Sequence, residues 1–217
     1  MSGFPNSPRL VKGGIVLVDP DSGAVKRIIV LQYNPDSVTR TLQPQGVTGE
    51  VADRSEVLRL KGPPIETIKL DAEIDATDQL EAADPQATAV GVHPQLAALE
   101  LIVYPTSAQL QANNALAQSG TLEIAPMIAP LTLFIWSKSR IVPVRLTDLS
   151  ITEEAFDPAL NPIRAKISLG LRVLTIDDFN FSDKGGSLFM AYQQQKEQLA
   201  ALNAAGTLSV FGIGGIP

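Results

Sequence analysis

The chain has 217 residues, of which 45% are hydrophobic and 18% charged, with a formal net charge of −6 and no cysteine. This composition supports a sizeable hydrophobic core and argues against wholesale disorder. The acidic balance argues against broad nucleic-acid binding and against attachment to anionic lipid, and the lack of cysteine excludes disulfides, thiolate metal sites and cysteine nucleophiles.

The N-terminal stretch MSGFPNSPRLVKGG contains no apolar segment of the kind found in secretory signals. No apolar run elsewhere approaches the ~20 residues of a membrane-spanning helix. We therefore expect synthesis in the cytoplasm and no direct membrane insertion.

Alternating and β-branched residues predict strands in the first third of the chain, at 14–18, 25–33, 38–44, 55–60 and 65–77. DPDSG predicts a hairpin between the first two strands, and KGPP a hairpin between the last two. Asn34-Pro35-Asp36 predicts a turn, with Tyr33 expected to anchor this corner.

Residues 65–77 have a period-two pattern that assigns each side chain to a face of the strand. One face is expected to pack into the core and carries Ile68, Leu70, Ala72, Ile74 and Ala76. The other is expected to meet water or a polar partner and carries Lys69, Asp71, Glu73, Asp75 and Thr77.

The middle of the chain predicts a helix at 93–105, with Pro94 tolerated in its first turn and an apolar face of Leu96, Leu99, Leu101 or Ile102, and Val103. Residues 106–119 fit either a weak helical continuation or a loop. Strands are predicted again at 130–138, 142–156 and 163–175, the first two joined across SKSR. A terminal helix is predicted at 187–206, with a stripe of Leu188, Tyr192, Leu199 and Leu202 and with Gly206 as its stop.

The titratable residues give little support to catalysis. His93, the single histidine, precedes a proline at a helix start, where a capping or surface role is favoured. Asp71, Glu73 and Asp75 could bind a hard cation such as calcium, but they are spaced ~7 Å apart along a strand, and a solvated acidic face is favoured. A hydrolase built on these carboxylates is the least supported reading, so we predict no catalytic, metal-binding or cofactor-binding residue and no cofactor.

Three groups of residues suit contacts between subunits. The acidic face of Asp71, Glu73 and Asp75 could meet a neighbour or line a lumen, and Arg40 could pair with such carboxylates, because interfaces are enriched in arginine. The apolar tail with Val210, Phe211 and Ile213 would either cover a partner surface or pack back on its own domain, since exposed apolar area costs ~25 cal/mol per Å². Trp136 is expected to be a core or edge aromatic rather than a ligand platform.

Several ordered motifs resemble the contractile injection system tube-like proteins, a phage-tail-derived family. LQYNPDSVTR (31–40) is similar to the opening of that family, IETIKLDAEIDATDQLE (65–81) to its following strand, and PQLAALELIVYP (94–105) to its helix. The last strands, 130–171, follow in the same order. The residues there that match the family are Phe134, Trp136, Phe156, Pro158, Pro162, Arg164 and Ala165.

The resemblance covers roughly residues 13–175. It implies a mainly β fold, an antiparallel sandwich or barrel of the tail-tube type with one central helix and a C-terminal helix. The expected division is an N-terminal extension at 1–12, a tube-like domain at 13–182, and a C-terminal helix and tail at 183–217. The implied function is structural: a hexameric ring that adapts the inner tube to the spike at the baseplate, with tube, spike and baseplate proteins as partners.

Two departures from the family pattern leave alternatives open. Ser137 follows Trp136 where glycine is usual, and the sequence shows no LysM-type module after its last helix, so no glycan contact is carried over. A tube-terminating or cap-end ring of the same particle is one alternative. A soluble β-sandwich that binds a carbohydrate or a cation, resting on the acidic strand and Trp136, is another.

Overall fold

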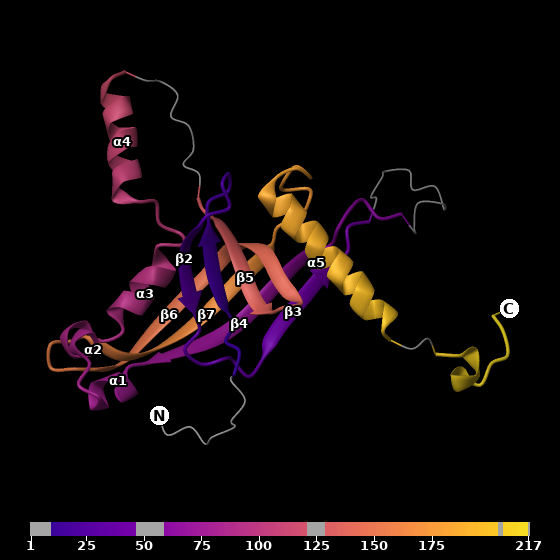
Figure 1. Ribbon diagram of the computed structural model, residues 1–217, viewed down its shortest axis with the longest axis horizontal. Helices are drawn as coiled ribbons and strands as arrows, with labels where there is room; N and C mark the ends of the chain where they lie inside the picture. The colour runs from indigo at the N-terminus through magenta and orange to yellow at the C-terminus, as the bar shows by residue number, and fades with distance from the viewer. Residues whose placement is uncertain (1–9, 47–58, 121–128, 204–205, 217) are drawn as a thin grey trace.

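The computed structural model describes residues 10–46, 59–120, 129–203 and 206–216. It contains one seven-stranded sheet with the strand order β2-β1-β5-β6-β7-β4-β3 (Figure 1). Every neighbouring pair is antiparallel. The expected mainly β, antiparallel architecture is therefore confirmed.

The strands differ greatly in length, and the three longest are adjacent at the centre of the sheet and toward its β3 edge. They are β1 (Gly14–Val18), β2 (Val25–Val30), β3 (Val38–Gln43), β4 (Ile65–Asp75), β5 (Leu131–Ser137), β6 (Arg140–Phe156) and β7 (Pro162–Val173).

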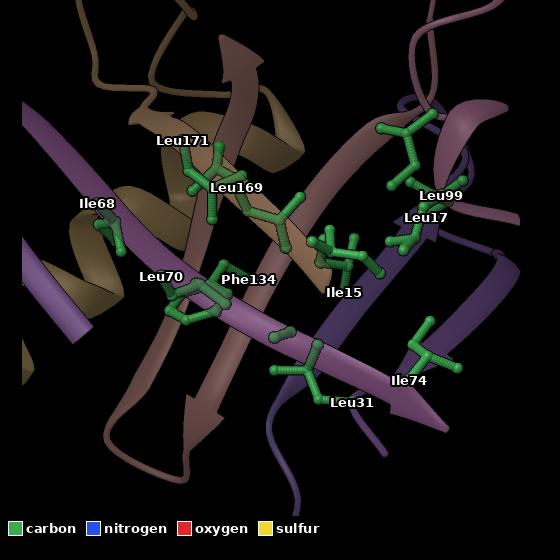
Figure 2. Packing of buried hydrophobic residues seen from close by; sticks show 14 of the residues in the cluster. Ile15, Leu17, Leu31, Ile68, Leu70, Ile74, Leu99, Phe134, Leu169 and Leu171 are labelled. Atoms are coloured by element: carbon green, nitrogen blue, oxygen red, sulfur yellow. The ribbon is translucent and has the colours of Figure 1, made fainter. Parts of the chain in front are cut away.

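The sheet is curled, and its concave face holds the core. β2 and β3 end the strand order, so hydrogen bonds among the described strands do not close the sheet into a barrel. The curl nevertheless brings the core residues of β1 and Leu31 into one hydrophobic cluster with those of β4. Figure 2 shows this interior, in which Phe134 lies beside β4 and the labelled side chains of β1, β4, β7 and α3 converge.

The alternation within β4 explains its place in the core. Ile68, Leu70, Ala72, Ile74 and Ala76 are all buried, while Lys69, Asp71 and Glu73 are exposed. The neighbouring strand β7 supplies Leu171, Leu169, Ile167 and Ala165 directly opposite the first four of these. The prediction for the core face of this strand is confirmed.

Five α-helices and one short 3₁₀ helix accompany the sheet in the described part of the chain. They are α1 (Thr77–Glu81), α2 (Pro85–Val90), α3 (His93–Glu100), α4 (Ser107–Gln118), α5 (Lys184–Ala201) and the short 3₁₀ helix η2 (Leu208–Phe211). α3 packs through Leu96 and Leu99, and α5 through Phe189 and Tyr192, into the same core cluster. α4 buries none of its side chains and stands away from the sheet (Figure 1). No helix in the described part of the chain is long and apolar enough to cross a membrane.

The helix predicted at 93–105 is present as α3 but ends at Glu100, and it is not alone in the middle of the chain, because α1 and α2 precede it and α4 follows it. Asp84 accepts a hydrogen bond from the Ala87 amide at the start of α2, and Gly91, with φ +56°, separates α2 from α3. A side chain at Gly91 would clash with the Pro162 carbonyl oxygen, so glycine is required there. Thr106 and Gln109 form a capping box that starts α4.

The predicted KGPP hairpin is also wrong. Most of the strand expected at 55–60 lies outside the described residues, but Leu60 bridges to Gly46 rather than to β4. The physical reason is that the first half of β4 already has β3 on one edge and β7 on the other. The hairpins across DPDSG and SKSR are confirmed. Residues 1–9 of the expected N-terminal extension lie outside the described part.

The terminal helix is shorter than predicted. α5 ends at Ala201 instead of Gly206, and Leu199 and Leu202 are exposed rather than part of a buried stripe. Figure 1 shows why: only the first half of α5 lies over the sheet, and the second half extends past it.

Candidate functional site

The corner at Asn34 ties the start of the chain to the sheet. The Asn34 amide donates to the Val11 carbonyl oxygen and accepts from the Gly13 backbone amide, each at 2.9 Å. Leu31 is buried in the core, whereas Tyr33 is 50% exposed. The expectation that Tyr33 anchors this corner is therefore corrected: Leu31 and Asn34 anchor it, because they face the core and the neighbouring backbone.

Arg40 on β3 is paired within its own chain. Its Nε and its Nη2 both lie 2.7 Å from Oε1 of Glu66, and Nη2 also donates to the Tyr192 hydroxyl at 3.0 Å. That hydroxyl donates in turn to Glu66 at 3.2 Å. Burial and the nearby Glu66 raise the pKa of Tyr192. The cluster fastens α5 to the β3–β4 edge, and the role of Arg40 at a subunit interface stays a prediction.

Lys196 extends this cluster by one turn of α5. Its Nζ lies 4.3 Å from the centre of the Tyr192 ring, a cation–π contact. Burial lowers the pKa of Lys196. The cluster therefore consists of an ion pair between β3 and β4, a Tyr192 hydroxyl that joins α5 to that pair, and an aromatic contact within α5.

The carboxylates of β4 alternate with cations on the adjacent strand. Arg164 donates to Asp75 at 2.8 Å and lies 3.4 Å from Glu73, and Lys166 pairs with Glu154 of β6 at 2.9 Å. The hydrogen bond to Asp75 raises the pKa of Arg164, and the hydrogen bond to Glu154 raises the pKa of Lys166. The outer face is thus a ladder of both charges rather than an acidic patch.

Asp75 is held as an anion by its surroundings. Burial acts to raise its pKa, but hydrogen bonds from the Thr77 hydroxyl, from the Thr77 amide at 2.7 Å and from Arg164 outweigh burial and lower it. Asp71 lies opposite Ser168 instead of a cation. In the described part of the chain, no group of three or more His, Cys, Asp or Glu side chains is placed to hold a metal ion.

Gln32 joins the β2 end of the curled sheet to the last residue of β4. Its side-chain amide donates to the Asp75 carbonyl oxygen at 2.6 Å and accepts from the Asp75 amide at 2.9 Å. These are the two bonds that a residue of an antiparallel partner strand makes with its opposite residue. Gln32 thus occupies, with a side chain, a place on the edge of β4 that a strand would fill.

Apolar side chains are exposed at the edge of the sheet and in the tail. On the edge strand β2, Val25, Ile28 and Val30 are more than half exposed. In the tail, Val210 and Phe211 are 77% and 76% exposed, and Ile213 is 44% exposed. The tail therefore does not pack back on its own domain, which was one of its two expected roles. Its place in a subunit interface stays a prediction.

The aromatic pair of β5 belongs to the core. The rings of Phe134 and Trp136 are stacked with their centres 5.8 Å apart, and Trp136 packs partly buried against the main cluster. This confirms the interpretation of Trp136 as a core aromatic. His93 is exposed at the start of α3.

Two residues that carry the geometry were missed in the sequence. Glu66 is two residues before Ile68 and therefore lies in phase with the core face, which marks it as a buried acid that needs a partner. No comparable signal marks Gln32, because its partner lies 43 residues away in the chain.

Comparisons with known proteins leave the family open. No protein-family model matches the sequence, and no curated protein matches it. Among solved structures, the chain is similar to a chain in the tail of an empty GTA particle, computed with helical refinement and C6 symmetry. The identity is 14% and the TM-score 0.31, over 75% of this chain and 90% of that chain. At these values the likeness establishes neither a family nor a function.

Proposed function

We propose that the chain is a structural subunit of a contractile injection particle rather than an enzyme. Six copies form a ring that adapts the inner tube to the spike at the baseplate, after synthesis in the cytoplasm. The observation that carries this proposal is the antiparallel sheet, in which β2 and β3 have one unpaired edge each among the described residues and β2 bears exposed apolar side chains.

The open edges explain why a ring suits this chain. Edge strands present unpaired backbone groups, and monomeric proteins usually protect them with charge, proline or a covering segment. β2 carries the charged Lys26 and Arg27 in its first half, but in its second half Ile28 and Val30 project apolar side chains into water. A closed ring of identical copies gives every such edge a neighbour and leaves no copy with a free one.

The sequence resemblance agrees with this geometry at its opening motif. In LQYNPDSVTR, the leucine enters the core, the asparagine binds the N-terminal segment, and Arg40 pairs with Glu66. The motif therefore sets the angle between β2 and β3, which are the two open edges. A ring subunit needs that angle fixed, because both edges must meet neighbours in one orientation.

A cap-end or tube-terminating ring would use the same edges and differs only in its neighbours along the particle. No observation favours the alternative of a carbohydrate or cation module. The carboxylates on which it relied are interleaved with Arg164 and Lys166, and Trp136 stacks on Phe134.

The test is the assembly state of the purified full-length chain, measured by native mass spectrometry and negative-stain electron microscopy. We expect six-fold rings, and we expect particles that lack the chain to fail in joining tube to spike. A chain that stays monomeric at high concentration, together with normal particles in its absence, would contradict the proposal. Labelling the chain in intact particles distinguishes the baseplate from the opposite end.

A further inference from the structure

A pocket of about 420 Å³, lined by both apolar and polar side chains, opens between β2 and the second half of β4, beside α3. Its floor includes Leu31, Ile74, Leu99 and Leu169, which belong to the core cluster. We call this pocket the seam slot, because it lies where the two ends of the curled sheet approach each other. Its volume lies within the ~300–1,000 Å³ typical of pockets that hold ligands.

Both long walls of the seam slot are open strand edges. The Leu31 amide donates to Gly13 of the neighbouring chain segment, so the backbone groups of Val30 and Ile28 point the opposite way, toward the slot. On β4, the Ala76 amide donates to Ile163 on the β7 side, whereas Asp75 points toward Gln32. By the same alternation, the backbone amide and carbonyl of Glu73 face the slot.

One buried acceptor in the wall of the seam slot has no partner. Oε1 of Gln79 is inaccessible to solvent and accepts no hydrogen bond within the described part of the chain. Gln79 is one of the residues that line the slot. A buried acceptor without a donor is costly, but because this atom is already closed to solvent it does not by itself define what enters the open slot.

The charge of the seam slot narrows the class of occupant. Glu73 is the one charged residue among those that line it, and its carboxylate already lies 3.4 Å from Arg164. The slot therefore suits an uncharged, apolar, extended segment with free backbone amides. The tail of this chain has that chemistry: residues 207–216, TLSVFGIGGI, carry no charged side chain and include four large apolar residues after Leu208.

We propose that the tail of a second copy enters the seam slot and adds as a strand between β2 and β4. In an extended conformation Phe211 and Ile213 share one face, which packs on the slot floor, and Val210 shares the other with Gly212. η2 is a single 3₁₀ turn with no buried residue, so little structure is lost when it extends. The inference rests on the proposed assembly of copies and names one of its contacts.

The occupant is the tail of another copy rather than the tail of the same chain. In Figure 1 α5 and the segment after it extend away from the side of the sheet where α3 lies. Within one chain, Val210 and Phe211 remain exposed. A head-to-tail contact of this kind closes into a ring when the rotation between copies allows it.

Site-specific crosslinking tests the proposal, because the 217-residue chain contains no cysteine. One preparation carries Ser209→Cys in the tail, and another carries Ala98→Cys in the slot wall. The matched control is Ala97→Cys, the exposed neighbouring alanine on α3 that does not line the slot. Equimolar mixtures are treated with a short flexible bis-maleimide and resolved on denaturing gels.

We expect a crosslinked dimer that is severalfold more abundant with Ala98→Cys than with Ala97→Cys. Adding Phe211→Asp and Ile213→Asp to the Ser209→Cys chain should abolish it. Equal yields at the two alanines, or a yield that the aspartates leave unchanged, would overturn the proposal. So would a chain carrying both Ser209→Cys and Ala98→Cys that crosslinks only within itself at every concentration.

The outcomes also separate this inference from the proposed function. Six-fold rings that persist in the Phe211→Asp, Ile213→Asp variant, without crosslinking, would reject the tail contact and leave the ring intact. Specific crosslinking in a chain that never forms rings would support the tail contact and reject the ring.

Discussion

The two halves of β4 begin from the same alternating pattern and end in different surroundings. Residues 65–70 have β3 on one edge and, from Thr67 onward, β7 on the other, and the Arg40–Glu66–Tyr192 cluster binds α5 there. Residues 71–75 have β7 on one edge, and among the described residues the other edge is met only by the Gln32 side chain. The first half is completed by its own chain, whereas the second is left with an open edge that another chain can fill.

The largest expected effect on stability comes from truncating a core side chain, and it should be larger in the first half of β4 than in the second. Ile68→Ala should lower the free energy of unfolding by about 2–5 kcal/mol, because the side chain is fully buried and leaves a cavity. Ile74→Ala borders the seam slot, where solvent already enters, and should cost less. Urea denaturation of both variants measures this difference. Equal losses would show that the second half is as tightly packed as the first.

The polar cluster should account for the next effect. Glu66→Ala removes the partner of Arg40 and should destabilise the fold by about 2–3 kcal/mol, since an arginine that is largely buried loses its carboxylate. Tyr192→Phe, which removes only the hydroxyl, should cost about 1 kcal/mol. Denaturation curves compare the two variants. An unchanged free energy of unfolding for Glu66→Ala would show that α5 docks without the ion pair.

Gln32→Ala should release the second half of β4 from β2. Two hydrogen bonds are lost, which should cost about 1–2 kcal/mol. Hydrogen exchange at the Asp75 amide should accelerate, while exchange at amides of residues 65–70 should stay slow. Gln95→Ala, an exposed change in the slot wall, is the matched control. An unchanged exchange rate at the Asp75 amide would show that the Gln32 side chain does not hold the second half of β4.

Acid should weaken the second half through Asp75. Because the folded state lowers the pKa of this carboxyl, its stabilisation is fully present above the ordinary value of 3.8. It is lost as the pH falls through the lower folded pKa. Melting temperatures from pH 6 downward should therefore converge for the wild type and Asp75→Asn as the pH falls below ~4. Asp71→Asn, opposite Ser168, is the control. Parallel curves for wild type and Asp75→Asn would contradict the ion pair.

The smallest effect on stability is expected for the tail. Deleting residues 207–217 should change the free energy of unfolding by less than about 0.5 kcal/mol, because the described tail side chains are not buried. The same deletion should weaken assembly, measured by sedimentation velocity. Loss of folded protein would show instead that the tail belongs to the core of one chain.

The strands of this fold were predictable because their signals are local. Alternation alone predicts the buried face that holds Ile68, Leu70 and Leu169, and the turn sequences DPDSG and SKSR predict their hairpins. The helical segment was predicted incorrectly where N-cap residues start a new helix, at Asp84 for α2 and at Thr106 for α4. The end of α5 was misjudged because an apolar residue such as Leu202 is buried only if the sheet reaches it.

The candidate interface residues were chosen for the chemistry of their side chains, without knowledge of which residues surround them in the fold. Phe211 was recognised because an apolar tail is conspicuous in sequence, and the structure leaves it exposed. Arg40 and Asp75 were predicted to meet a neighbouring subunit, and their partners within the chain, Glu66 and Arg164, were not foreseen because they depend on strand register. Register is a long-range property that single strands do not encode.

The sequence by itself determined which segments form strands, which face of each strand is apolar, and that the tail is uncharged and apolar. These follow from side-chain periodicity and composition, which act over a few residues. Only the tertiary structure decided that β3 covers one half of β4 and stops before the other, leaving the seam slot. The order and overlap of strands depend on contacts across dozens of residues, such as that of Gln32 with Asp75, and these exist only once the sheet has curled.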